Sequence, residues 1–182
     1  AGLSLGDVGT LAVSAGPGSF TGLRVGIATW KGLALGHRLP LIGVPTLGAL
    51  VRLAGPLEGL VCPVLDARMG EVFAAAFRYD AGGRETVVAE CATPIEEFAK
   101  KLEGQPVTLF GDGVGAYRER IAACMPAARL LPELFWPPRA SAVAAEAEDM
   151  LRAGCCTDAA SVSPVYLRKS QAEENRGKTA AP

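Results

Sequence analysis

The residues with the clearest chemical potential form a glycine-rich stretch, Gly16 to Gly22, which follows a short apolar run and opens an apolar segment of helical length. In the order strand, glycine turn and helix, backbone N–H groups at the helix N-terminus can bind a phosphate group. The lysine that a P-loop places on its phosphates is missing from this stretch, so the Walker pattern is not met. The candidate residues of a phosphate-binding loop are Gly16, Gly18, Ser19 and Thr21.

The helix expected after this turn, from Leu23 to Leu35 with Gly36 at its end, gives the same glycines a second interpretation. Small residues recur on one of its faces in steps of three and four, and bulky residues share another face. A helix that is apolar nearly all round has to be covered on more than one side. Close packing against a second helix or another subunit is therefore the favoured use, and a phosphate site remains the alternative. The small face comprises Gly22, Gly26, Thr29, Leu33 and Gly36, and the bulky face comprises Phe20, Leu23, Ile27, Trp30 and Ala34.

Three polar residues, Asp66, Arg68 and Glu71, cluster where a hairpin turn is expected. One interpretation is an exposed turn with local ion pairing, which contributes little to stability. The other is a polar contact surface, because an acid and a base two residues apart on a tight turn present a fixed charge pair. The sequence does not decide between the two.

The remaining candidate motifs are weaker. A second glycine cluster, Gly111 to Ala116, fits the short pattern Gly-x-Gly-x-x-Ala, and Glu133 stands where a ribose-binding acid would follow. We expect a plain strand-to-helix turn there, because the remaining chain is too short for a dinucleotide domain. His37 is the sole histidine, and the 5 cysteines are scattered without a Cys-x-x-Cys pair. The sequence therefore predicts no metal site, no nucleophilic triad and no catalytic residue.

The composition is that of a globular protein with a sizeable core, since the 182 residues are 49% hydrophobic and 20% charged. A formal net charge of -1 argues against a surface that binds nucleic acid by bulk electrostatics. The odd number of scattered cysteines indicates a reduced, cytoplasmic setting. Glycine, proline and polar residues interrupt the apolar runs, so we expect no membrane span.

The elements that must position these residues form two related α/β series. Residues 10–53 have the order β-α-β-α, and the chain from Leu60 onward has the order βββαβαβα. The first series matches the second half of the other, which predicts a duplicated unit whose first copy lacks its opening three strands and first helix. Three helix starts are also predicted from capping signals: Thr46 as an N-cap, a capping box from Thr93 to Glu96, and Ser141 as a cap.

These series define the expected domains. Residues 1–55 are a remnant of an N-terminal half, and residues 56–168 are a C-terminal half whose last helix packs back on the first. Residues 169–182 are polar and are expected to form a flexible tail.

Three motifs, in this order, closely resemble the TsaB (YeaZ) family. They are the runs GPGSFTGLRVGIATWKGLALGHRLPLIGV, LDARMGEVFAAAF and PVYLR. The resemblance covers nearly all of residues 8–168 and implies an actin-like (ASKHA, sugar kinase/Hsp70-type) fold of two α/β halves. It further implies a non-catalytic scaffold or activating subunit of the bacterial complex that makes N6-threonylcarbamoyladenosine in tRNA.

The resemblance also implies partners. A TsaD-type catalytic subunit and a TsaE-type ATPase are expected, with a homodimer when the partner is missing, only indirect contact with tRNA, and no membrane. No cofactor is implied, and binding of ATP or ADP is a minor alternative. The helix opened by the glycine turn would lie in a helix-to-helix interface. Carried over by position, the interface candidates are Gly22, Arg24, Val25, Gly26, Thr29, Gly32 and Leu33.

The sequence departs from this group of proteins at several points. Where the catalytic relative has a His-x-x-x-His metal pair, the chain has Thr46 and Leu50, so neither metal binding nor peptidase activity is carried over. Trp30 stands where a small or short polar residue is expected and would alter packing at the interface. The competing hypotheses are a nucleotide-binding kinase or hydrolase of the actin-like superfamily, and a purely self-associating homodimer.

Overall fold

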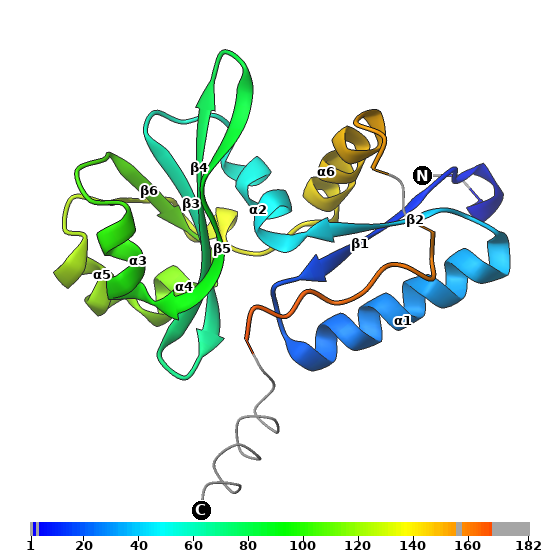
Figure 1. Cartoon of the computed structure of the whole chain (residues 1–182), viewed down its shortest axis with the longest axis horizontal. Helices are drawn as coiled ribbons and strands as arrows, with labels where there is room; N and C mark the ends of the chain where they lie inside the picture. The colour runs from blue at the N-terminus through cyan, green and yellow to red at the C-terminus, as the bar shows by residue number, and fades with distance from the viewer. Residues whose placement is uncertain (1, 3, 156–157, 169–182) are drawn as a thin grey trace, which may run out of the picture.

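The computed structural model describes residues 2, 4–155 and 158–168, and the described strands form two sheets (Figure 1). The smaller sheet has two parallel strands, in which Leu11 lies opposite Leu41 and Gly16 lies opposite Pro45. After a short 3-10 helix over Leu5–Asp7, this part of the chain comprises β1 (Leu11–Gly16), α1 (Phe20–His37), β2 (Leu41–Pro45) and α2 (Thr46–Ala54).

The larger sheet has five strands in the order β5-β4-β3-β6-β7. Its first three strands form an antiparallel meander, and β6 and β7 continue the sheet in parallel on the other side of β3. Its elements are β3 (Leu60–Arg68), β4 (Glu71–Asp80), β5 (Gly83–Pro94), α3 (Ile95–Lys101), β6 (Val107–Phe110), α4 (Asp112–Ala116), α5 (Arg118–Cys124), β7 (Arg129–Leu130), a 3-10 helix (Glu133–Phe135) and α6 (Ala140–Arg152). This is the predicted order of elements, except that the single helix expected over residues 115–123 is divided at Tyr117.

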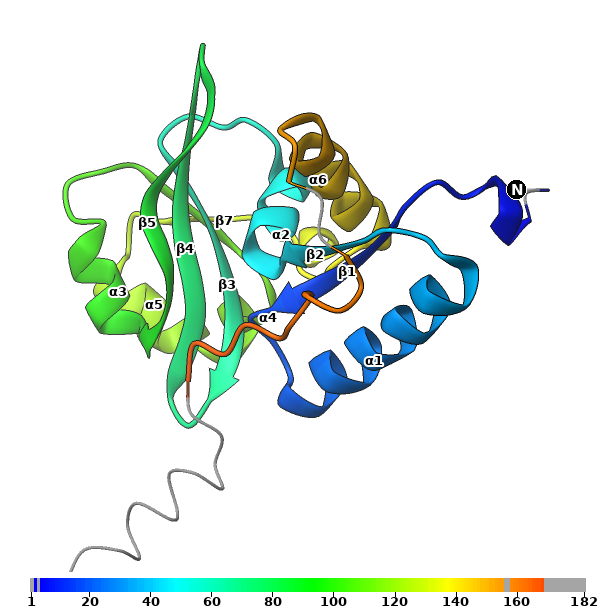
Figure 2. The same ribbon diagram turned by 45° about the vertical axis from the view of Figure 1, so that its right-hand side comes forward.

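Helices cover both sheets, and α2 links them. α1 lies on one face of the smaller sheet and α6 on the opposite face (Figures 1 and 2). α2 contacts strands of both sheets, and its Leu47 and Leu50 pack with Val61 and Phe77 of the larger sheet. These side chains are almost entirely buried. Burial of a large aliphatic side chain contributes about 1.5–3 kcal/mol, so this core holds the two sheets together.

The capping roles predicted for three residues are wrong. Pro45 occupies the N-cap position of α2, so Thr46 already lies inside the helix and its hydroxyl caps nothing. Thr93 lies in β5 opposite Val72, because the strand continues to Pro94. Its backbone is therefore paired with β4 and does not form a capping box. Ser141 lies inside α6, whose N-cap is Arg139.

The second glycine cluster makes a plain strand-to-helix turn. Gly111 has φ 111°, and a Cβ there would overlap the carbonyl oxygen of Val64. A Cβ on Gly113 would lie 2.8 Å from Val64 Cγ1. These glycines therefore let α4 pack directly on β3, which accounts for the motif without a dinucleotide. Glu133, the proposed ribose ligand, is exposed in its 3-10 helix.

The chain after α6 returns to the smaller sheet. α6 packs against α2, β1 and β2. The orange segment in Figures 1 and 2, residues 158–168, then passes β1 and runs towards the hairpin between β3 and β4. The division into domains at residue 55 stays a prediction, and the predicted flexible tail, 169–182, lies outside the described residues.

Candidate functional site

A cleft of about 1020 Å³ lies where the two sheets meet, and it contains two motifs that are separate in the sequence. Gly18, Ser19 and Phe20 of the glycine turn line it, together with Asp66 and Arg68 of the hairpin. The cleft is of the size that ordinarily accommodates small molecules in proteins. The structure therefore brings two of the four phosphate-loop candidates, Gly18 and Ser19, and two of the three polar candidates to one place, whereas Gly16 and Thr21 do not line the cleft.

The glycine turn has a structural role on one side and faces the cleft on the other. Gly16 has φ 126°, and a Cβ there would overlap the carbonyl oxygen of Val165, so only glycine lets the C-terminal segment pass so closely. Ser19 is the N-cap of α1, and its Oγ accepts a hydrogen bond of 3.3 Å from the Gly22 N–H. Thr21 is exposed in the first turn of α1.

The C-terminal segment completes the cleft wall, and sequence reasoning used it only as a family signature. The Tyr166 ring stacks on Phe20, with 4.7 Å between ring centroids, and its hydroxyl accepts a 2.9 Å hydrogen bond from Arg24 Nε. Arg168 Nη1 donates to the Ala67 carbonyl oxygen at 3.1 Å. The sequence signal that could have indicated this role is the spacing of Tyr166 and Arg168, two residues apart in a segment with no other distinctive residues.

The polar hairpin cluster is mostly satisfied internally. Asp66 Oδ1 accepts hydrogen bonds from the Arg68 N–H at 2.8 Å and from the Tyr117 hydroxyl at 2.9 Å, and Arg68 Nη1 lies 3.1 Å from Asp66 Oδ2. Burial, with the bond to Asp66, raises the pKa of Tyr117. Glu71 Oε2 lies 3.4 Å from Arg168 Nη1. The Arg68 side chain, 85% exposed, is therefore the member of the cluster that is open to solvent.

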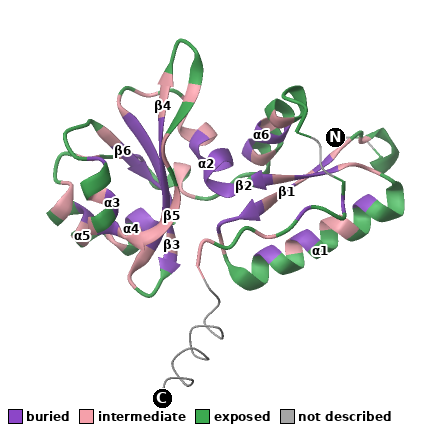
Figure 3. Cartoon of the chain, in the orientation of Figure 1, coloured by how far each residue is buried: buried purple, intermediate pink, exposed green. Residues whose placement is uncertain are grey.

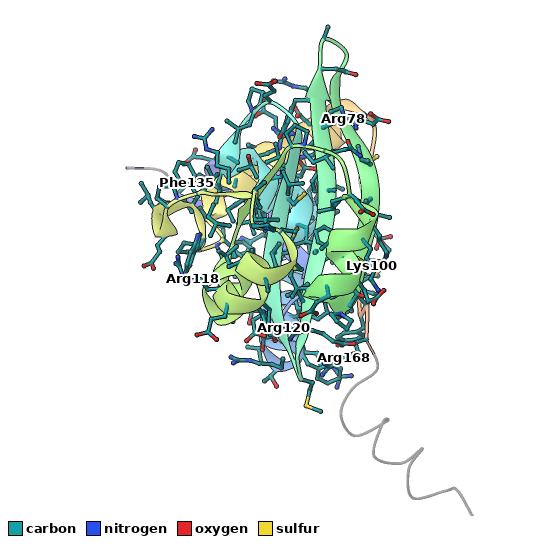
Figure 4. All side chains as sticks on the ribbon, turned by 90° about the vertical axis from the view of Figure 1, so that its left-hand side faces the viewer. Arg78, Lys100, Arg118, Arg120, Phe135 and Arg168 are labelled. Atoms are coloured by element: carbon teal, nitrogen blue, oxygen red, sulfur yellow. The ribbon has the colours of Figure 1, made fainter. Side chains whose placement is uncertain are left out.

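Two details of this hairpin differ from the prediction. β3 continues to Arg68, so Asp66 belongs to the strand and the turn is confined to Met69 and Gly70. Arg120, which sequence reasoning did not single out, donates from Nη1 to the Gly70 carbonyl oxygen at 3.0 Å. Arg120 and Arg168 therefore both hold this end of the hairpin (Figure 4).

α1 buries one face and leaves the other uncovered (Figure 3). Leu23, Ile27 and Ala34 are buried, the latter two against β1 and β2, whereas Val25 is 61% exposed. A Cβ built on Gly32 meets no atom within 4 Å. Of the predicted interface residues, Gly26 is half-buried, and the exposed ones are Gly22, Arg24, Val25, Thr29, Gly32 and Leu33.

An ion cluster that the sequence did not indicate fastens α6 to α2 and β5. Glu146, whose side chain is 8% exposed, is bound by Arg52 and lies 2.5 Å from Arg84 Nη2. Burial opposes ionisation of Glu146, but the hydrogen bonds from Arg84 and Arg52 prevail and lower its pKa. Arg52 also pairs with Asp149. A buried carboxylate with two arginines is a structural clasp whose disruption is costly.

Two buried side-chain oxygen atoms, Thr46 Oγ1 of α2 and Glu90 Oε1 of β5, have no hydrogen-bond partner among the described residues. Burial raises the pKa of Glu90 to about 7, although its carboxyl accepts a hydrogen bond from the Leu47 N–H.

Among the residues that the structure describes, no group of three or more His, Cys, Asp or Glu side chains could hold a metal ion. No described helix is long and apolar enough to cross a membrane.

Comparison with known proteins matches this chain to one group. The family model described as TsaD, tRNA N6-adenosine threonylcarbamoyltransferase, matches residues 1–176. The tRNA threonylcarbamoyladenosine biosynthesis protein TsaB of Escherichia coli K12 is 42% identical over 114 residues, 59% of this chain and 49% of that protein. TsaB of Bacillus subtilis 168 is 30% identical over 117 residues, 63% of this chain and 51% of that protein. The chain thus spans about half the length of these curated relatives.

Solved structures show the same similarity. YeaZ from Pseudomonas aeruginosa has a TM-score of 0.75 at 29% identity, over 90% of this chain and 77% of that chain. An uncharacterized protein with similarity to peptidase YEAZ from Pseudomonas aeruginosa has a TM-score of 0.76 at 30% identity, over 92% of this chain and 77% of that chain. These likenesses confirm the predicted actin-like α/β fold class; the number of missing strands stays a prediction.

Proposed function

Because the chain belongs to the TsaB/YeaZ family, we propose that it acts in the biosynthesis of threonylcarbamoyladenosine in tRNA as a non-catalytic partner of a TsaD-type subunit. The docking element is α1. The observation that carries the proposal is the exposed outer face of this helix, where Gly32 and Gly36 lie among the exposed apolar side chains of Val25, Leu33 and Leu35.

The glycines of this face are not explained by packing within the described chain. A Cβ built on Gly26, Gly32 or Gly36 meets nothing within 4 Å, so alanine would fit at each position. Glycine in a helix interior costs about 1 kcal/mol relative to alanine. Gly26 and Gly32, which lie in the helix interior, therefore cost about 2 kcal/mol of helix stability with no packing benefit to the described fold. The space left by these glycines would allow a second helix to pack closely on α1, with about 8–10 Å between the two helix axes.

The docking surface follows from the exposure along α1. Val25 and Gly32 lie seven residues apart on the outward side, opposite the buried Ile27 and Ala34. Val25 provides an exposed apolar side chain, and the neighbouring Gly32 leaves room for side chains of the partner. The proposed docking residues are Gly22, Arg24, Val25, Gly26, Thr29, Gly32 and Leu33.

We propose no catalytic residue, metal or nucleotide cofactor for the chain itself. Thr46 and Leu50 are buried on α2 at the two positions where the catalytic relative has histidines, and neither side chain is a metal ligand of ordinary strength. His37 is exposed at the last position of α1, far along the helix from the glycine turn. The proposed setting is the cytoplasm, with a TsaE-type ATPase in the complex, a homodimer when the TsaD-type subunit is missing, and tRNA contacted only through the partner.

Co-purification with an affinity-tagged TsaD-type subunit tests this function. The chain is expected to be retained by the tagged subunit, and the Gly32→Leu variant is expected to be lost from it. Gly9→Leu is the control, because Gly9 is exposed outside any helix and a Cβ there meets nothing within 4 Å. Retention of Gly32→Leu at the wild-type level would contradict docking through α1.

A further inference from the structure

A contact that docking through α1 does not use joins the two sheets at the start of α2. The N-cap of this helix is Pro45, whose side chain cannot accept a hydrogen bond from the first N–H groups. The Glu90 carboxyl, from β5 of the larger sheet, accepts the N–H of Leu47. Leu47 is the second residue of α2, and its N–H is one of those that an N-cap side chain ordinarily binds. Glu90 therefore caps α2 from the larger sheet.

The shape of β5 favours this contact. It is an edge strand of the larger sheet, and its residues Ala89 and Glu90 together stand opposite the single residue Ala75 of β4. A bulge of this kind bends the strand and re-aims a side chain. Arg84 of the same strand also reaches the first turn of α2, where its Nη1 donates to the Gly48 carbonyl oxygen at 2.9 Å. The larger sheet thus binds both an N–H and a carbonyl group of this turn.

The surroundings of Glu90 do not neutralise a charge on it. Its Oε1 is buried and has no hydrogen-bond partner within the described part of the chain. Both arginines near this turn are bound to Glu146, and Tyr79 stays neutral because burial raises its pKa. The ionisable side chains on the elements packed around the turn are Arg52 of α2, Arg84 of β5, Tyr79 of β4, and Glu146 and Asp149 of α6.

Ionisation of Glu90 therefore opposes the closed contact. Burial raises its pKa to about 7 from the ordinary 4.5, although the Leu47 N–H lowers it. A carboxyl whose pKa is raised in the closed state stabilises that state fully below pH 4.5, and the stabilisation is lost as the pH rises through about 7. The protonated carboxyl still accepts the Leu47 N–H through its carbonyl oxygen, whereas the ionised carboxyl gains hydration when the contact opens.

We propose that the contact of Glu90 with the start of α2 is a pH-sensitive joint between the two sheets, closed when the carboxyl is protonated and loosened when it is ionised. The joint borders the cleft, because Thr46, which precedes Leu47, and Phe73 of β4 both line it. Loosening of the joint therefore changes the wall of the cleft on the side of α2. The joint is separate from the docking face of α1 and does not depend on the proposed partner.

Amide hydrogen exchange of the full chain, measured at pH 6 and pH 8 and corrected for the intrinsic rate at each pH, tests the joint. The Leu47 amide reports opening of the contact, and Leu109, buried in β6, reports unfolding of the whole chain. Leu47 is expected to open more often than Leu109, and its opening equilibrium is expected to rise up to about 10-fold from pH 6 to pH 8. An opening of Leu47 that does not rise with pH, or that occurs only as often as that of Leu109, overturns the proposal.

Two substitutions assign the effect to Glu90. Glu90→Gln keeps the shape and an acceptor oxygen but cannot ionise, so the opening of Leu47 is expected to be the same at both pH values. Glu85→Gln, on an exposed position of β5, is the matched control and is expected to keep the pH dependence of the wild type. A rise in Glu90→Gln as large as that of the wild type would assign the pH dependence to another group and overturn the proposal. The wild-type measurement decides alone if Glu90→Gln does not fold.

Discussion

Replacement of Gly32 by alanine separates the stability of the chain from its ability to dock. Gly32 lies inside α1, and apart from the adjacent backbone of its own helix no atom of the described chain lies within 4 Å of the point that a Cβ would occupy, so the added methyl group faces open space. Alanine exceeds glycine in helix propensity by about 1 kcal/mol. For a chain of this size, that gain raises the melting temperature by about 2–4 °C.

The same methyl group is expected to weaken docking. If a partner helix packs against the glycine face, an added methyl group overfills the contact at a cost of about 1–3 kcal/mol. That cost corresponds to a Kd about 5- to 150-fold higher. Stability and affinity therefore change in opposite directions, which a general effect on folding cannot produce.

The assay pairs thermal melting with a titration against the TsaD-type subunit. Ser141→Ala is the control, because Ser141 is exposed on α6, where alanine also favours the helix but lies away from α1. The control is expected to raise the melting temperature slightly and leave the Kd unchanged. If Gly32→Ala raises stability and binds the partner as tightly as the wild type, the outer face of α1 is not the docking surface.

Three further predictions concern the fold around the site. Burial raises the pKa of Glu90 to about 7 from its ordinary 4.5. Between these pH values the folded chain holds a proton that the unfolded chain has released, so stability falls as the pH rises. Glu90→Gln should therefore leave the melting temperature unchanged at pH 4 and raise stability at pH 8 by about 1–2 kcal/mol, a value reduced because solvent screens the partly exposed carboxyl; equal effects at both pH values would contradict this. Glu146→Ala leaves two arginines without their carboxylate and should cost about 3 kcal/mol in urea unfolding; a loss below about 0.5 kcal/mol would show that the clasp is dispensable. Gly111→Ala forces a Cβ onto the Val64 carbonyl and should lower the melting temperature by several degrees, whereas Gly9→Ala, with open space around it, should not; equal melting temperatures would refute the steric explanation.

Local patterns in the sequence were sufficient for most of the fold. The apolar runs and turn residues predicted both element series, and the motifs predicted the family, because each depends on residues close together in the chain. Capping was less predictable. Thr93 has the sequence signature of a capping box, but its backbone pairs with Val72 in β5, and that tertiary interaction outweighs the local signal.

The composition of the cleft could not be predicted in the same way. Phe20 and Tyr166 are stacked although they are far apart in the sequence, and no periodicity links them. Thr46 was interpreted as a cap, whereas Pro45 holds the N-cap position and the Thr46 hydroxyl is buried with no hydrogen-bond partner among the described residues. Contacts of this kind follow from the way the two sheets meet and not from any single segment.

Hydrogen exchange of the chain, measured with and without the TsaD-type subunit, tests docking through α1 most directly. Amides in the first and last turns of α1 exchange by local opening, and a partner helix lying along the outer face suppresses that opening. The expected result is protection gathered in Phe20–His37, with α3 and α5 unchanged. Protection confined to α3 and α5, or none on α1 in a complex shown to have formed, would contradict docking through this helix.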